Sequence, residues 1–315
     1  RDEFRGTGGS LYSLRHRDIL TGSERVRIEI RDKDSDIVTA VKNLSPGLDY
    51  DIDYLQGRIL LAEPLSATAS DGMLVDGGTN GGNRVFLVAR YEYTPGFEEL
   101  DTLVAGGRAH YWFNDYVKLG VTSNNNDEDD AESSLNAVDV TLRKSTNSWV
   151  RVEASESEGG DVTTLVSDDG GFNFDTVSNL AEPEPSGNAY RVEASLGLDD
   201  VFENVKGKVT LHSQSLDAGY SSPGLTATSD TDQYGASLEM PVTERVGVRA
   251  KAEKKSEELG LETSATEVDV DYLLTENWTL SGGVRQDERT DNSPVVPLTQ
   301  EQGERADAVV RAGYD

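Results

Sequence analysis

The side chains with the widest chemical repertoire in this sequence are three histidines, His16, His110 and His212. No two of them are separated by two or four residues, the spacings that bring two imidazoles onto one metal ion from a strand or a helix. His212 precedes Ser213, but a catalytic serine and its base are recognised by geometry, so adjacency carries little weight. We therefore predict no histidine metal site and no catalytic residues, and we expect that the protein is not an enzyme.

Two acidic runs have the composition of calcium ligands. They are Asp32-Lys33-Asp34-Ser35-Asp36 and the four residues Asp127, Glu128, Asp129 and Asp130. The first run lacks the glycine and the distal glutamate of a calcium-binding loop, and the second is a weak calcium candidate. The sequence predicts solvated turns at both places. No helical pattern follows the glycine pairs, so no nucleotide-binding loop and no other cofactor is predicted.

The charge balance excludes several classes of function. The 315 residues carry 58 acidic and 29 basic side chains, a net charge of −29, and no cysteine. So large an acidic excess argues against nucleic acid as a partner. The lack of cysteine excludes disulfide scaffolds and thiolate metal sites, and it suits an oxidising compartment. No apolar run approaches the roughly 18 residues of a membrane helix, and no signal peptide opens the chain.

Apolar and polar residues alternate with a period of two through most of the chain, which predicts β-strands with two chemically different faces. In segment 190–198, Tyr190 and Val192 share one face, and Arg191 and Glu193 share the other. Eleven such segments follow residue 102, at 103–111, 117–122, 138–143, 150–155, 190–198, 208–214, 233–242, 245–253, 267–274, 278–285 and 307–314.

Short and long connections alternate between these eleven segments. The long ones are 123–134, 156–188, 216–232, 254–264 and 287–305. In a transmembrane β-barrel every second connection lies on the same side of the membrane, with short periplasmic turns and long extracellular loops. The first three long connections hold 5, 8 and 3 acidic residues and no lysine or arginine, so we expect solvated, mobile loops outside the cell.

The two faces of the predicted strands suit lipid and water. An arginine or lysine facing lipid at the bilayer midplane costs ~2–4 kcal/mol, so the charged face is predicted to line the lumen. The lumen candidates are Arg191, Glu193, Arg249, Lys251, Glu253, Asp269, Asp271 and Arg285. These side chains either fill the barrel as a salt-bridge network or line a wet pore, and both alternatives stay open. Aromatic residues near short connections predict an interfacial girdle of Trp112, Trp149, Tyr272 and Trp278.

Residues 1–94 have shorter strand patterns and more frequent turn residues, which predicts a small β-sandwich followed by a linker at 95–101 and the barrel at 102–315. Its strand candidates are 10–15, 25–31, 37–44, 50–54, 58–62 and 85–93, with a two-residue turn at Gln56-Gly57. Barrels usually have an even number of strands. Segment 85–93 is therefore an alternative twelfth barrel strand, or else the chain continues beyond Asp315.

Several motifs of this first region resemble modules of very large Gram-negative surface proteins. They are FRGTGGSLY at 4–12, LRHRDI at 14–19, GSERV at 22–26 and GLDYDIDYLQGRI at 47–59, closed by YEY at 91–93. A similar DYxIDYxxGR hairpin occurs in the giant barrel of a gliding-motility secretion channel. The resemblance covers about the first 100 residues and implies a β-domain that precedes a carboxy-terminal outer-membrane barrel. It implies a location and a fold, and no catalytic residues.

The sequence thus predicts an all-β outer-membrane barrel of 11 or 12 strands that acts as a surface scaffold or anchor in a Gram-negative bacterium. Its expected partners are outer-membrane lipid or lipopolysaccharide and other surface proteins. The alternatives are a pore or translocation channel for ions, a polymer or a secreted chain, and a soluble extracellular β-rich adhesin that associates through strand edges.

Overall fold

The computed structural model describes residues 1–75, 82–94, 104–126, 133–159, 164–177, 186–222, 225–293 and 302–314. Most of these residues lie in β-strands, nearly all of which pair antiparallel, and the helical structure among them is one 3₁₀ turn, Leu198–Asp200. The prediction of an all-β protein is confirmed. In these ranges no helix is long and apolar enough to cross a membrane.

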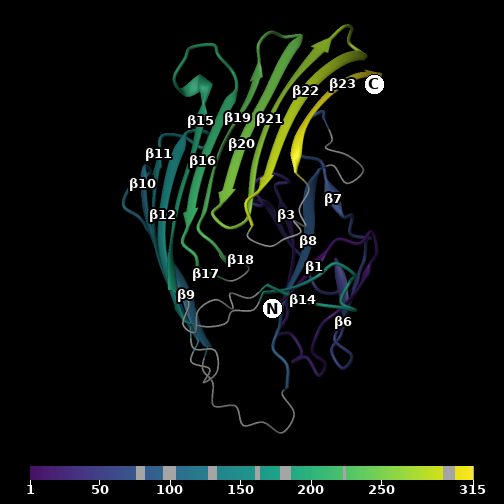
Figure 1. Cartoon of the computed structure of the whole chain (residues 1–315), viewed down its shortest axis with the longest axis vertical. Coiled ribbons are helices and arrows are strands. Elements are labelled where there is room, and N and C mark those ends of the chain that lie inside the picture. Colours follow the sequence, from purple (N-terminus) through teal and green to yellow (C-terminus); the bar gives the residue numbers. More distant parts are fainter. Residues whose placement is uncertain are drawn as a thin grey trace.

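Eleven strands make one large curved sheet, in which each strand pairs antiparallel with its neighbours in the sequence (Figure 1). They are β9 (Val104–Trp112), β10 (Val117–Asn126), β11 (Ser133–Arg143), β12 (Trp149–Gly159), β15 (Ser186–Gly197), β16 (Lys208–Leu216), β19 (Thr231–Pro241), β20 (Val246–Glu257), β21 (Leu261–Leu273), β22 (Trp278–Asp291) and β23 (Gly303–Tyr314). All eleven strands predicted after residue 102 are present. We call this sheet the wall.

The wall is an open sheet in this structure. Among the described residues, β9 pairs only with β10 and β23 pairs only with β22, so the first and last strands do not meet. The predicted closure into a barrel is therefore not observed. One of the long connections is also much shorter than expected, because β20 and β21 continue to a three-residue turn at 258–260.

The wall exposes its apolar face and buries polar side chains on the other face, which is the reverse of a sheet in a soluble protein. The apolar face is open, with Val192 42% and Val268 39% exposed, whereas on the polar face Asp139 and Glu267 are each 1% exposed. Alternation along every strand puts these two rows on opposite sides of the sheet. The fold therefore buries part of the charged face of the wall, including Asp139, Glu267 and Asp269, and leaves the apolar face uncovered.

The polar face is covered by a second body, which has two sheets of its own. A seven-stranded sheet contains β14 (Asp175–Val177), β13 (Thr164–Ser167), β1 (Asp2–Arg5), β8 (Asn83–Arg90), β3 (Arg25–Arg31), β4 (Val38–Asn43) and β7 (Thr68–Ala69). A three-stranded sheet contains β2 (Leu11–Ser13), β6 (Arg58–Leu61) and β5 (Tyr50–Asp53). We call the described part of 1–94, together with 164–177, the amino-terminal module.

One hydrophobic core joins the two sheets of the module. Phe4 and Leu87 of the larger sheet and Tyr12 and Ile59 of the smaller sheet belong to a single cluster, and all four are fully buried. The Phe4 and Tyr12 rings meet edge to face with centroids 5.5 Å apart. In the module, the apolar residues of each strand point into a core between two sheets. In the wall, the apolar residues of each strand point away from the module and stay exposed, although the alternation has the same period of two.

The structure decides one alternative that the sequence left open for the module and changes one expected turn. Segment 85–93 does not provide a twelfth wall strand, because β8 pairs with β1, β3 and β7 in the module. The expected two-residue turn at Gln56-Gly57 is a four-residue turn at 54–57. Gly57 has a φ of +65° there, and a Cβ on it would lie 2.0 Å from the His16 carbonyl oxygen, so only glycine fits.

The longest connection also folds differently from the expectation of a solvated loop. Residues 164–177 contain β13, which pairs parallel with β1, and β14, which pairs with β13. Phe174 packs against the module core, with its ring 5.7 Å from that of Phe4. A segment from the middle of the wall sequence is therefore part of the module. The predicted linker at 95–101 lies outside the described residues.

Candidate functional site: the charged interface between module and wall

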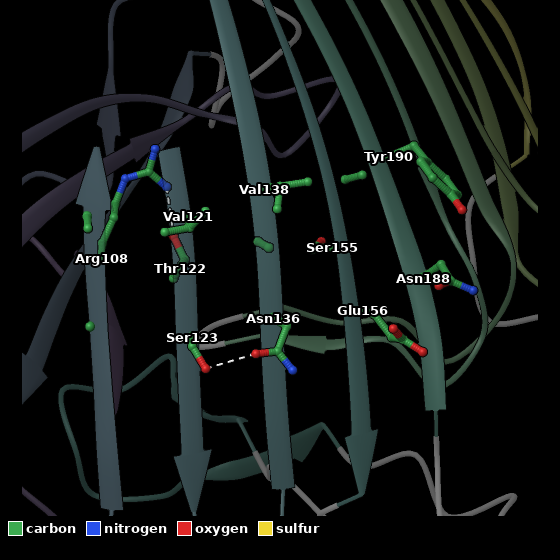
Figure 2. Close-up of a pocket in the computed structure, with 14 residues that line it drawn as sticks. Arg108, Val121, Thr122, Ser123, Asn136, Val138, Ser155, Glu156, Asn188 and Tyr190 are labelled. Atoms are coloured by element: carbon green, nitrogen blue, oxygen red, sulfur yellow. Dashed lines mark hydrogen bonds between the residues drawn. The ribbon is translucent and has the colours of Figure 1, made fainter. Parts of the chain in front are cut away.

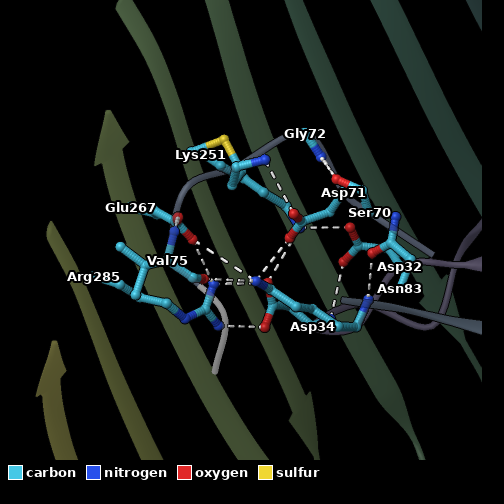
Figure 3. A network of polar contacts seen from close by, with 12 residues as sticks. Asp32, Asp34, Ser70, Asp71, Gly72, Val75, Asn83, Lys251, Glu267 and Arg285 are labelled. Carbon is cyan, nitrogen blue, oxygen red and sulfur yellow. Dashed lines mark hydrogen bonds and ion pairs between the residues drawn. The ribbon is translucent and has the colours of Figure 1, made fainter. Parts of the chain in front are cut away.

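The module rests on the polar face of β20, β21 and β22 through two of its segments (Figure 3). One is the turn 32–36, between β3 and β4, and the other is the segment 73–75. Opposite them, Lys251 on β20, Glu267 on β21 and Arg285 on β22 lie side by side. Lys251 is the register partner of Glu267, and Glu267 is in turn the register partner of Arg285. Ionic side chains from distant parts of the chain thus converge at one place.

Asp34 is the centre of the first contact. Its carboxylate accepts hydrogen bonds from Arg285 Nη2 at 2.6 Å and from Lys251 Nζ at 3.1 Å. Lys251 also donates to Asp32 Oδ2 at 2.5 Å. Arg285 donates to Glu267 Oε2 at 3.1 Å as well, and its side chain is only 4% exposed. A buried guanidinium is stable only when its donors are matched by carboxylates, and this interface supplies them from both bodies.

The second contact uses backbone donors. The N–H of Leu74 donates to Asp269 Oδ2 at 2.6 Å, and the N–H of Val75 donates to Glu267 Oε1 at 2.9 Å. Gly283 lies beside this contact, and a Cβ on it would lie 2.3 Å from Asp269 Oδ1 and 3.1 Å from the Val75 side chain. The absence of a side chain at 283 therefore lets the segment 73–75 approach the wall.

The acidic turn 32–36 is built for this contact and is not a solvated turn. Asp32 Oδ1 accepts the N–H groups of Asp34 and Ser35, both at 3.0 Å, which folds the turn around its own carboxylate. Burial alone would raise the pKa of Asp32, but the Lys251 charge and these hydrogen bonds outweigh it and lower that pKa. The same opposition, with Lys33 as the partner, lowers the pKa of Asp71.

All eight predicted lumen residues lie on the polar face of the wall. Lys251, Asp269 and Arg285 contact the module. Arg249 pairs with Asp271 at 3.1 Å and lies 3.6 Å from Asp269, beside the same interface.

The remaining three predicted lumen residues form their ion pairs within the wall. Arg191 and Glu193 pair with each other at 2.5 Å on β15, and Glu253 lies 3.0 Å from His212 Nε2. Sequence reasoning missed Asp32 and Asp34 as partners of the wall. The concentration of acids in 32–36 was the available signal.

The three histidines are held in separate places. His16 Nδ1 lies 2.9 Å from the Tyr91 hydroxyl and its ring stacks on Tyr93, whereas His110 lies on β9 and His212 on β16. Among the residues that the structure describes, no group of three His, Cys, Asp or Glu side chains is arranged to hold a metal ion. The calcium candidates Asp127, Glu128, Asp129 and Asp130 lie outside the described residues.

The four predicted girdle aromatics divide between the two faces. Tyr272 and Trp278 lie on the apolar face, where Trp278 packs against Tyr314 with centroids 5.2 Å apart. Trp112 lies on the polar face, with the Arg143 guanidinium 4.4 Å from its ring centroid. Trp149 also lies on the polar face, because its register partner is the buried Ser195. A girdle on the apolar face therefore includes Tyr272 and Trp278 and excludes the other two.

The apolar face has a polar margin on the side of the long connections (Figure 2). Ser123, Asn136, Glu156 and Asn188 are successive register partners across β10, β11, β12 and β15. They line an open hollow of about 710 Å³ together with Val121, Val138 and Tyr190. The apolar residues occupy the next rows toward the short turns, so the apolar band ends at this row.

Comparison with known proteins gives no relative, since no family model, no curated protein and no solved structure matches the chain. What the site can do therefore rests on its geometry. The interface is a set of matched buried charges that holds the module against the wall.

Proposed function

We propose that the chain is an outer-membrane β-barrel protein of a Gram-negative bacterium in which the module, a small β-sandwich, docks on the lumen side of the barrel wall. Its role in this proposal is that of a surface scaffold or anchor. Outer-membrane lipid or lipopolysaccharide is the partner of the apolar face, and other surface proteins are the partners of the acidic connections.

One observation carries the proposal: the uncovered face of the eleven-stranded wall is apolar. Each strand places two to four apolar side chains on this face, as with Val150, Val152 and Ala154 on β12 before the polar Glu156. Soluble monomers rarely expose contiguous apolar patches beyond a few hundred Å². Strands of 9–14 residues also match the roughly 9–11 residues that a tilted membrane strand requires.

The charged interface supports the anchor reading over an open pore. A wet pore would leave the charges of β20–β22 facing water, whereas Arg285, Glu267 and Asp269 are buried against the module. A channel is the second candidate, because hollows of about 390 and 330 Å³ remain between module and wall. Conductance steps across a planar bilayer in single-channel recordings would favour the channel, and their absence would favour the anchor.

The proposal is tested by asking which face of the wall meets lipid. Spin labels at Val192, Val268 and Val270 should be quenched by a lipid-soluble collision agent, and labels at Glu193 and Arg249 should not. The full chain should also migrate differently on SDS gels before and after boiling, as closed barrels do. A monodisperse folded chain in plain buffer, with no detergent, would support the soluble adhesin instead.

A further inference from the structure

The seven-stranded sheet of the module has one face rich in arginine, which is unexpected in a protein with a net charge of −29. Register pairs place Arg25 beside Arg90 and Arg31 beside Arg84 on this face, and Arg27 lies between them along β3. The opposite face of the same sheet forms the hydrophobic core, so the arginines point away from the core, and Arg27 and Arg31 face the wall.

This arginine face and the wall enclose a chamber of about 330 Å³. Arg1, Arg27 and Arg31 line it from the module, and Arg191 and Lys255 line it from β15 and β20. Both enclosing surfaces therefore carry cations, and the lining carboxylates, Glu29, Asp36 and Glu257, are fewer than the cations.

The carboxylates near the chamber are too few for its guanidiniums. In the module, Glu29 accepts from Arg27 Nε and Arg31 Nη2, both at 2.8 Å, and Glu3 accepts from Arg31 Nη2 at 2.8 Å and also from Arg1. Three guanidiniums thus share two carboxylates.

On the wall side of the chamber, Glu153 is the register partner of Arg191. Arg191 and Arg151 lie 2.5 and 3.8 Å from the same Glu193. Lys255 is balanced by Glu257 at 2.7 Å. Among the residues that line the chamber, the five cations Arg1, Arg27, Arg31, Arg191 and Lys255 therefore face only three carboxylates, those of Glu29, Asp36 and Glu257, so the lining is short of two negative charges.

Some of these guanidiniums have donors without an acceptor. Among the described residues, the buried Nε atoms of Arg1, Arg31 and Arg151 have no hydrogen-bond partner. Burial also lowers the pKa of Arg1, and the attraction of Glu3 does not compensate for it. Buried donors of this kind are costly when they stay unpaired.

We propose that the chamber binds an oxyanion of the phosphate class, held between Arg27 and Arg31 of the module and Arg191 of the wall. A phosphate dianion supplies the two missing negative charges and several acceptor oxygens in the geometry that guanidinium groups match. The site depends on the docking of module and wall and not on whether the apolar face meets lipid. It is therefore tested independently of the proposed function.

The test is a calorimetric titration of the folded full chain with sodium phosphate, in zwitterionic detergent and at low salt. Phosphate should bind saturably, and R31Q and R191Q should each weaken binding about tenfold, the effect of removing one charge-assisted hydrogen bond. R311Q is the matched control, because Arg311 lies on the polar face of β23 and does not line the chamber. Its affinity for phosphate should equal that of the unaltered chain.

R31Q could weaken phosphate binding by disturbing the module. R191Q avoids this, because Arg191 is one-third exposed and lies on the wall. A second arm replaces free phosphate by phosphatidylcholine vesicles that contain phosphatidylglycerol. Vesicle binding that falls in both variants, without binding of free phosphate, would identify a lipid headgroup as the source of the oxyanion. Absence of binding in both arms, or an equal loss in R311Q, would overturn the proposal.

Discussion

Two adjacent glycines of β22 show how a single residue decides whether the module can dock. Gly283 points toward the segment 73–75 and Asp269, whereas nothing lies within 4 Å of a Cβ built on Gly282. Both are glycines in the same strand and neither has a positive φ, so they differ only in the face that they occupy.

The first prediction compares these two glycines. Gly283→Ala should destabilise the folded chain by about 1–3 kcal/mol, because a methyl group there overlaps Asp269 and crowds Val75. Gly282→Ala should change the stability by less than about 0.5 kcal/mol. The urea midpoint of unfolding in detergent measures both, and equal shifts for the two variants would contradict the contact between 73–75 and the wall.

The second prediction concerns the buried guanidinium of Arg285. Arg285→Met should destabilise the chain by about 3–5 kcal/mol, because Asp34 and Glu267 would keep buried charges without their partner. Lys254→Met is the control, since Lys254 and Glu262 form a pair at 2.8 Å in which both side chains are more than one-third exposed. Its effect should be at most about 1 kcal/mol, as for surface pairs in general. A similar small effect of Arg285→Met would mean that the interface is solvated.

At the scale of the element, the turn 32–36 and the neighbouring strands of the module concentrate carboxyls whose pKa values are lowered in the fold. Burial would raise the pKa of each of these carboxyls, but nearby cations outweigh it and lower the pKa. The cation is Lys251 for Asp32 and Lys33 for Asp71, and Arg27 and Arg31 act together on Glu29. When ionised, Asp32 holds the module on the wall through Lys251, whereas Asp71 and Glu29 form ion pairs within the module.

The third prediction follows from the sign of these shifts. A carboxyl whose pKa is lowered on folding stabilises the folded state above its unfolded pKa, near 4, and loses that contribution as the pH falls through the folded pKa. The stability of the full chain should therefore be level above about pH 5 and fall below about pH 4. Urea midpoints between pH 3 and 7 measure this. Asp32→Asn should lower the urea midpoint above pH 5 and should reduce the fall of the midpoint between pH 5 and pH 3. An unchanged fall would mean that other carboxyls cause the acid sensitivity.

At the scale of the whole molecule, the module and the wall are interleaved in the sequence. Strand β13 comes from the connection between β12 and β15 of the wall, yet it pairs with β1 at the other end of the chain. Two bodies that exchange a segment in this way do not separate at a single linker. The module is therefore completed only when the wall sequence that follows it is present.

The fourth prediction tests this interleaving with two phenylalanines of the same segment. Phe174→Ala should destabilise the module by about 2–4 kcal/mol, because Phe174 packs on Phe4 in the core. Phe172→Ala should have little effect, since Phe172 is 81% exposed. Hydrogen exchange of the β1 and β8 amides reports the module specifically, and it should accelerate only in the first variant. Equal exchange rates in both variants would place the segment outside the module.

The sequence by itself determined the wall strands, because a period of two survives in every strand and assigns each side chain to a face without knowledge of its neighbours. Tyr190, Val192, Arg191 and Glu193 lie on the predicted faces of β15 for this reason. Turn chemistry was less decisive, since the strands β20 and β21 continue through a connection that is rich in polar residues.

Only the tertiary structure decided which polar residues meet. Asp34 is about 250 residues from Arg285 in the chain, and no periodic pattern records a contact of that separation. The same limit explains why 164–177 was expected to be solvated and why the ends of the wall were expected to meet. Strand pairing between distant segments depends on backbone hydrogen bonds that any sequence can make, so side-chain alternation predicts the faces of a strand but not its partner.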